Sequence, residues 1–125
     1  MTCPDSLSAV PFPEPLPEIG VDELAGRLGG VTVIDVRQPA EYSGGHVRTS
    51  RLIPLAEVPD HVDELAAMTG SGTDDRVYLV CRSGARSAMA GEFLVEHGVA
   101  AVNVAGGMLA WVEAGHEVVA GDQPT

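Results

Sequence analysis

Apolar and polar positions along the chain divide it into short segments of two alternating kinds. Three runs are almost continuously apolar and rich in β-branched residues, which is typical of strands covered on both faces: residues 31–36, 76–80 and 101–104. Four segments are typical of short helices, with apolar residues on one side: 21–28, 59–69, 84–97 and 108–114. A helical turn from Pro39 to Tyr42 and a short strand at 52–53 complete the pattern.

The order of these segments predicts the fold class. Strands and helices alternate and are joined by short loops, so we expect an α/β domain with a mostly parallel sheet and helices on both faces. Residues 1–18 contain five prolines, which remove hydrogen-bond donors and block helix, so this segment is expected to be an extended tail. The folded domain is expected over residues 19–121.

Composition and charge narrow the class of partner. The 125 residues are 45% hydrophobic but only 4% aromatic, enough for one core made mainly of aliphatic side chains. Seven arginines, with no lysine, stand against 18 acidic residues and give a formal net charge of −11. Phosphate binding needs a basic face, so nucleic acid and anionic membrane surfaces are not expected as partners.

The cysteine count and the N-terminal sequence indicate the cellular compartment in which the protein is expected. Two cysteines, Cys3 and Cys81, are too few for a disulfide framework. The N-terminus has no positively charged segment followed by an apolar stretch, so no signal peptide is expected, and no run approaches the roughly 18 apolar residues of a membrane span. The sequence therefore predicts a soluble protein of the reducing cytoplasm.

Chemistry is expected at Cys81, which ends an apolar strand and precedes a loop and a helix. Helix N-termini and nearby cations stabilise a thiolate, and two of the seven arginines, Arg82 and Arg86, lie within five residues of it. The amides of residues 82–86 can converge on an anion, and Gly84 permits the positive φ that such a loop needs. The alternative is a buried, unreactive core cysteine.

The length of this loop bears on which anion it holds. Four residues separate Cys81 from Arg86, one fewer than in the corresponding loop of cysteine phosphatases. A shorter loop fits a single sulfur atom, carried on the cysteine as a persulfide, better than it fits a tetrahedral phosphate. The count therefore favours sulfur transfer over phosphoryl transfer.

Several segments together resemble the single-domain rhodaneses, a family of sulfurtransferases. They follow in the order and spacing of that family: VIDVR at 33–37, PAEY at 39–42, GHV at 45–47, IPL at 53–55, CRSGARS at 81–87 and AGGMLAW at 105–111. Each segment alone is a weak signal, but together they are specific and span roughly residues 19–119. The resemblance implies a single rhodanese-like domain with a mostly parallel central sheet of about five strands.

What the resemblance implies is a transfer in two steps. The Cys81 thiolate takes the outer sulfur of a small anionic donor (thiosulfate or a persulfide, including one on a partner protein), and a thiol or cyanide then accepts it. Substrate binding is expected from the loop, at Arg82, Ser83, Gly84, Ala85, Arg86 and Ser87. Within that set Arg82 is expected to attract the donor and Arg86 to brace the loop. No cofactor and no metal is implied, and no two histidines have metal-ligand spacing.

Supporting roles are expected outside the loop. The resemblance implies that Asp35 and Arg37, beyond the end of a strand, anchor the loop by hydrogen bonds and ion pairing; an ordinary strand-end ion pair is the alternative. It also implies that His46 is structural, and Trp111 is expected to pack in the core.

One segment departs from the family and leaves other functions open. Relatives typically carry Pro-Gly-Ala after the GHV segment and an Asn before the Ile-Pro, whereas this chain has RTSRL at 48–52. Arg48 and Arg51 are expected on the surface, with a place near the mouth of the site as the alternative. The altered segment and the Pro-rich tail suggest a non-catalytic interaction or regulatory module as a second hypothesis. A cysteine phosphatase or an arsenate-reductase-like enzyme is a third, against which the loop count speaks.

Overall fold

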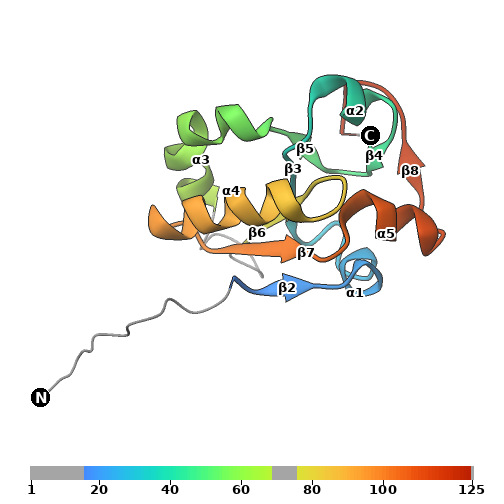
Figure 1. The fold of residues 1–125 in the computed structure, drawn as a ribbon, viewed down its shortest axis with the longest axis horizontal. Coiled ribbons are helices and arrows are strands. Elements are labelled where there is room, and N and C mark those ends of the chain that lie inside the picture. Colours follow the sequence, from blue (N-terminus) through green and yellow to red (C-terminus); the bar gives the residue numbers. More distant parts are fainter. Residues whose placement is uncertain (1–15, 69–75, 125) are drawn as a thin grey trace, which may run out of the picture.

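The computed structural model describes residues 16–68 and 76–124. The strands are β2 (Glu18–Ile19), β3 (Thr32–Asp35), β4 (His46–Val47), β5 (Arg51–Leu52), β6 (Val77–Val80), β7 (Ala101–Val104) and β8 (Val118–Val119). The helices are α1 (Val21–Ala25), α2 (Pro39–Ser43), α3 (Val62–Met68), α4 (Ala85–Glu96), α5 (Gly107–Glu113) and a 3₁₀ helix, η1 (Leu55–His61). Figure 1 shows the strands crossing the middle of the molecule with the helices around them.

A five-stranded sheet forms the centre of the fold. Its order is β2-β7-β6-β3-β5, and every neighbouring pair is parallel. The predicted α/β class and the sheet of about five strands are therefore confirmed. Because all five strands run the same way, their carboxyl ends meet at one edge of the sheet, where ligands of open α/β sheets bind.

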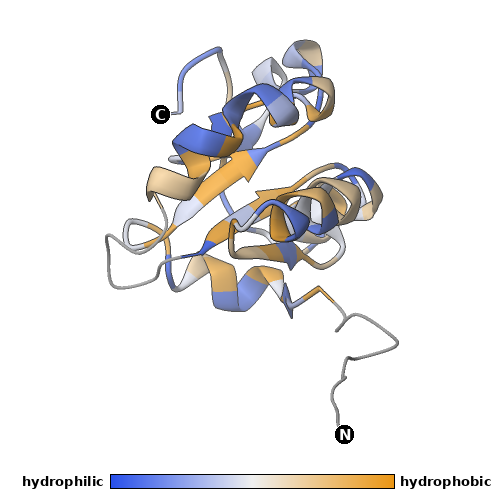
Figure 2. Cartoon of the chain, turned by 90° about the vertical axis from the view of Figure 1, so that its left-hand side faces the viewer, coloured by the Kyte–Doolittle hydropathy of each residue, from blue (hydrophilic) through white to orange (hydrophobic). Residues whose placement is uncertain are grey.

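The strands alternate their side chains between two apolar cores. On β3, Ile34 packs into the core covered by η1, α3 and α4, whereas Val33 packs into the core covered by α1 and α5. Figure 2 shows the same arrangement, with apolar strands enclosed between helices whose hydrophilic positions face outward. This burial on both faces explains why the strands are almost continuously apolar.

The predicted helix over 59–69 begins differently in the structure. Residues up to His61 belong to the 3₁₀ helix η1, and the α-helix α3 starts only at Val62. Pro59 lies inside η1 and has no N–H to donate, so a single regular α-helix cannot run from Leu55 through Pro59 into α3.

The predicted tail is in part a component of the fold. Residues 1–15 lie outside the described residues, but Leu16 packs against the core at Gly91 of α4. The Pro17 carbonyl accepts a hydrogen bond from the backbone N–H of Asn103, and Glu18 begins the edge strand β2. Residues 16–18, the last three of the predicted tail, therefore contact the folded domain, and Pro17 lies just before β2.

A second, two-stranded sheet was not predicted from the sequence. β4 pairs antiparallel with β8, which brings the C-terminal segment back beside α2 (Figure 1). The Gly121 amide donates to the Ser43 carbonyl, and the Thr49 amide donates to the Pro124 carbonyl. Thr49 has a φ of 73°, a left-handed conformation that β-branched residues rarely adopt. The segment at 48–52 therefore holds its turn on an unfavourable residue.

Among the described residues, no helix is long and apolar enough to cross a lipid bilayer.

Candidate functional site

Cys81 directly follows β6, at the carboxyl edge of the sheet. The residue is only 1% exposed, so its thiol is buried rather than on the surface. The loop after it turns at Gly84, which has a φ of 106° and is the N-cap of α4. The positive φ expected at Gly84 is therefore confirmed, and the twelve-residue α4 directs its N-terminus at the loop.

Hydrogen-bond donors converge on the sulfur of Cys81. The Gly84 amide lies 3.0 Å and the Ser87 hydroxyl 3.3 Å from Sγ. Burial raises the pKa of the Cys81 thiol, but hydrogen bonds from the Ser87 hydroxyl and from the amides of Ser87, Gly84 and Ser83 outweigh it. The pKa therefore lies below its usual value, as for a thiol that serves as a nucleophile.

The same loop is held from its other side by the start of α5. The Met108 amide donates to the Cys81 carbonyl at 2.8 Å, and the Leu109 amide donates to the Arg82 carbonyl at 3.0 Å. A Cβ on Gly107 would lie 2.4 Å from the Cys81 carbonyl oxygen, so this close approach requires glycine. The N-terminus of one helix thus binds the carbonyls of the loop while the other faces the sulfur.

Arg86 connects the loop to α2. Its guanidinium forms two hydrogen bonds with the Glu41 carboxylate, at 2.8 and 2.9 Å. The hydrogen bonds from Arg86, helped by the Gln38 amide, lower the pKa of Glu41 from 4.5 to about 2. With both terminal nitrogens of the guanidinium engaged by Glu41, the geometry supports a bracing role for Arg86 rather than a direct contact with substrate.

Asp35 and Arg37 form a buried ion pair at the end of β3. The Arg37 guanidinium donates to both Asp35 oxygens, at 2.8 to 3.1 Å, and also to the Gly45 carbonyl at 2.8 Å. Arg37 therefore ties the end of β3 to the turn between α2 and β4, across the site from the Cys81 loop. This geometry supports the ion-pair alternative, which anchors a wall of the site.

His46 and Trp111 are buried packing residues. The His46 ring stacks on Tyr42 with centroids 3.7 Å apart, and its Nδ1 donates to the Tyr42 carbonyl at 2.9 Å. Trp111 is 2% exposed and donates from Nε1 to the Glu117 carbonyl. Within residues 16–68 and 76–124, no cluster of three His, Cys, Asp or Glu side chains could hold a metal ion.

An open hollow of about 590 Å³ lies between α2 and α5, beside the loop. Arg82 lines it together with Arg37 and Glu41, and its apolar wall includes three exposed side chains, Leu109, Val112 and Val118. Most of its lining is apolar, so it differs in character from the polar donors at the sulfur.

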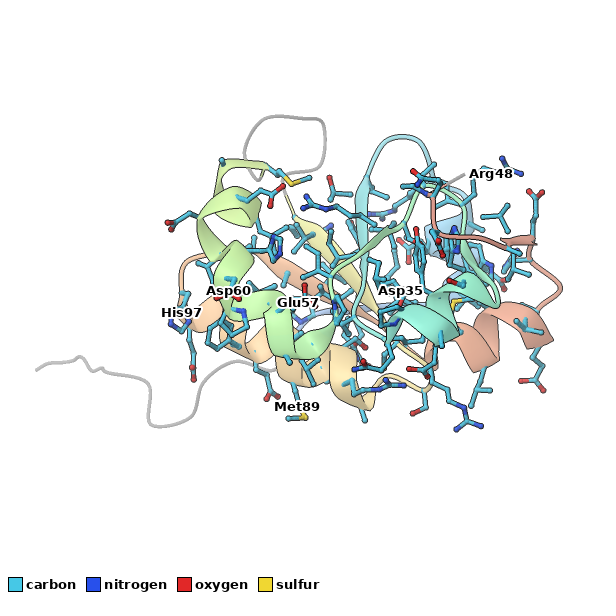
Figure 3. All side chains as sticks on the ribbon, turned by 90° about the horizontal axis from the view of Figure 1, so that it is seen from above. Asp35, Arg48, Glu57, Asp60, Met89 and His97 are labelled. Carbon is cyan, nitrogen blue, oxygen red and sulfur yellow. The ribbon has the colours of Figure 1, made fainter. Side chains whose placement is uncertain are left out.

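The two arginines of the altered segment lie elsewhere. Arg48 pairs with Glu117 at 2.6 Å, and Arg51 pairs with Glu64, in both cases on the surface. Figure 3 shows Arg48 at the periphery of the molecule, whereas Asp35 lies in its interior. The expected surface position of both arginines is confirmed, and each of their charges is matched by a glutamate.

Asn103 belongs to the site but was missed in the sequence. Its side chain is buried on β7, where Oδ1 accepts from the Ser87 hydroxyl at 2.5 Å and Nδ2 donates to the Gly84 carbonyl at 3.3 Å. The signal that would have found it is a lone polar residue in a buried apolar strand, next to the strand that carries Cys81.

These features define an α/β protein built around a thiol that is held by backbone amides at the carboxyl edge of a parallel sheet. The chain belongs to the rhodanese-like domain family, whose model matches residues 20–114.

Relatives and solved structures agree with this assignment. A protein of Allochromatium vinosum named "Sulfurtransferase" is 34% identical over 107 residues, which cover 82% of this chain and 94% of that one. Thiosulfate sulfurtransferase PspE of Escherichia coli is 37% identical over 75 residues, covering 60% and 68%. The crystal structure of a rhodanese-related protein from Thermoplasma volcanium is 34% identical, with a TM-score of 0.72 and coverage of 82% and 97%. Two Bacillus subtilis relatives are longer, and the match spans 59% and 51% of their lengths.

Proposed function

We propose that this protein is a sulfurtransferase that carries sulfane sulfur as a persulfide on Cys81. The observation that carries the proposal is the set of donors around Sγ, which lowers the pKa of a buried thiol at the N-terminus of α4. Relatives named as sulfurtransferases support the same reaction class. The loop, one residue shorter than that of cysteine phosphatases, supports sulfur over phosphate as the transferred group.

The first step loads the cysteine. The Cys81 thiolate attacks the outer sulfur of thiosulfate or of a persulfide, forming a bond from Sγ to that sulfur. The donor's S–S bond breaks, and sulfite or a thiolate leaves with the electron pair. Arg82 is exposed at the edge of the hollow, where its charge attracts the anionic donor.

The second step unloads it. A thiolate or cyanide attacks the outer sulfur of the persulfide, and the Cys81 thiolate leaves with the electron pair of the broken S–S bond. The amides of residues 82–87 stabilise the anion on the loop, in the manner of an oxyanion hole. The apolar wall of Leu109, Val112 and Val118 gives an acceptor larger than cyanide a surface to lie on.

A thiosulfate-to-cyanide assay tests the proposal. Wild type is expected to form thiocyanate and Cys81→Ser to form none, whereas Cys3→Ser is the matched control and is expected to retain full turnover. Turnover that survives Cys81→Ser, or no turnover with thiosulfate or any persulfide donor, contradicts the proposal. Hydrolysis of an aryl phosphate that is lost in Cys81→Ser would favour the phosphatase instead.

A further inference from the structure

The Ser87 hydroxyl lies near more hydrogen-bond acceptors than it can donate to at once. Three acceptors lie within hydrogen-bond distance of its oxygen: Cys81 Sγ at 3.3 Å, the Gly84 carbonyl at 3.3 Å and Asn103 Oδ1 at 2.5 Å. A hydroxyl carries one proton, so it donates to one of them at a time. The Ser87 side chain is fully buried, so bulk water cannot replace the missing donor.

The orientation of the Asn103 amide is fixed by its other partners. Nδ2 faces two oxygen acceptors, Glu18 Oε2 at 3.2 Å and the Gly84 carbonyl at 3.3 Å. Turning the amide over would place Oδ1 against both of these oxygens, so Oδ1 is the atom that faces Ser87. Asn103 therefore presents Ser87 with an acceptor, in competition with the sulfur of Cys81.

We propose that Asn103 is a positioning residue whose Oδ1 accepts the hydrogen bond from the Ser87 hydroxyl whenever Cys81 Sγ is uncharged. Ser87 then donates to the sulfur only when negative charge develops on it. This inference deepens the proposed sulfur transfer and rests on it for its role in turnover.

The charge on Sγ changes through the reaction, and the acceptor of the Ser87 hydroxyl changes with it. In the neutral thiol, Ser87 donates to Asn103. When the thiol loses its proton to solvent, the anionic sulfur becomes the stronger acceptor and the hydroxyl turns to it. In the persulfide the charge lies on the outer sulfur, so the hydroxyl returns to Asn103.

The last change matters for the rate of the second step. When the acceptor bonds to the outer sulfur, the electron pair of the broken S–S bond goes to Sγ, and Ser87 turns towards the leaving thiolate. A donor engaged in the transition state, but satisfied elsewhere in the persulfide, lowers the barrier without stabilising the ground state.

The competition between Asn103 and the sulfur predicts that two substitutions shift the pKa of Cys81 in opposite directions. Ser87→Ala removes a donor from the thiolate and should raise the pKa of Cys81. Asn103→Val suits a buried strand but accepts no hydrogen bond, so Ser87 keeps two acceptors, the sulfur and the Gly84 carbonyl. The carbonyl already accepts from the Ala88 amide, so the hydroxyl should turn to the sulfur and lower the pKa of Cys81. Asn103→Asp keeps an oxygen facing Ser87 and adds negative charge, so it should raise the pKa. A purely structural role for Asn103 predicts a raised pKa for every substitution, because the loop would loosen.

The pH dependence of Cys81 alkylation by iodoacetamide, read by intact mass in a Cys3→Ser background, tests the proposal. We expect Asn103→Val to lower the midpoint by about 0.5 to 1 unit, roughly three- to tenfold more thiolate below it. We expect Ser87→Ala to raise the midpoint by about 1 unit, and the double variant to match Ser87→Ala. Glu96→Gln, on the exposed side of α4, is the control and should leave the midpoint unchanged.

Three results would overturn the role of Asn103: an unchanged midpoint in Asn103→Val, a raised one, or the same lowering in the Ser87→Ala background. Thermal unfolding checks that each variant folds, and Asn103→Ala replaces Asn103→Val if the latter does not. The readout needs no sulfur donor. An absent midpoint shift therefore refutes the role of Asn103 even where the persulfide forms, and an absent persulfide refutes the proposed function even where the shift is seen.

Discussion

Replacing Gly107 by alanine is expected to disturb the Cys81 loop from the side opposite the sulfur. The new Cβ would lie 2.4 Å from the Cys81 carbonyl oxygen and 2.7 Å from that of Arg82. Ordinary contact begins at 3.4 Å, so the difference of 1.0 Å between 2.4 and 3.4 Å must come from separation of α5 and the loop. Both neighbouring groups are backbone, which cannot turn aside as a side chain would.

The magnitude follows from the contacts that would be lost. Holding alanine at the left-handed φ of Gly107 costs about 1–2 kcal/mol, and the two hydrogen bonds from α5 to the loop contribute about 1 kcal/mol each. We therefore expect Gly107→Ala to lower the free energy of unfolding by about 3–4 kcal/mol. Gly115→Ala is a matched control, because Gly115 has a φ of +83° but no atom within 4 Å of its Cβ position.

Urea unfolding of the two variants separates packing from φ strain. Gly115→Ala should lose only the φ contribution of about 1–2 kcal/mol, some 2 kcal/mol less than Gly107→Ala. Persulfide formation at Cys81 should slow in Gly107→Ala and stay normal in Gly115→Ala. Equal losses of stability in the two variants would refute the claim that α5 fixes the loop by this close approach.

Three further outcomes are expected. The Arg86 hydrogen bonds lower the pKa of Glu41 from 4.5 to about 2. The stabilisation of the fold by the ionised Glu41 carboxylate is therefore complete above pH 4.5 and is lost as the pH falls through about 2. The unfolding free energies of wild type and Glu41→Gln should converge over that range. Thr49→Gly places glycine, which adopts a positive φ without strain, where a β-branched residue now holds one. It should raise the unfolding free energy by about 0.5–1 kcal/mol. Val112→Ser removes exposed apolar surface from the hollow and should raise the KM of an apolar thiol acceptor about fivefold, leaving that of cyanide unchanged.

Each of these has a result that would contradict it. A constant difference between Glu41→Gln and wild type from pH 7 to about 2 would mean that the Arg86 pair does not set the pKa of Glu41. A destabilised Thr49→Gly would mean that the turn at 48–52 depends on the threonine side chain. An equal rise in the KM of cyanide would mean that Val112 shapes the loop rather than the acceptor surface.

The central layer of the fold could be predicted because burial on both faces leaves a plain pattern. β3, β6 and β7 are short apolar runs, and α4 carries regularly spaced apolar residues. The short strands β2, β4 and β8 could not be predicted in this way, because each is only two residues long. Their pairing is decided by partners far away in the sequence, such as Val118 for Val47.

The site residues likewise divide into those that local sequence predicts and those that depend on partners far away in the chain. Cys81, Gly84 and Arg86 could be placed because local chemistry dictates a thiol, a positive φ and a cation at fixed spacing. The partner of Arg86 is Glu41, 45 positions away, and no local pattern connects the two. Asn103 is likewise 16 positions from Ser87, so only the parallel pairing of β6 and β7 reveals the competition for one proton.

Intact-mass spectrometry after treatment with thiosulfate tests the central claim most directly. The account predicts a gain of one sulfur atom, mapped by peptide analysis to Cys81 and not to Cys3, reversed by dithiothreitol or cyanide and absent from Cys81→Ser. A Cys81 that alkylates as a thiolate but gains no sulfur from thiosulfate or any persulfide donor would contradict it.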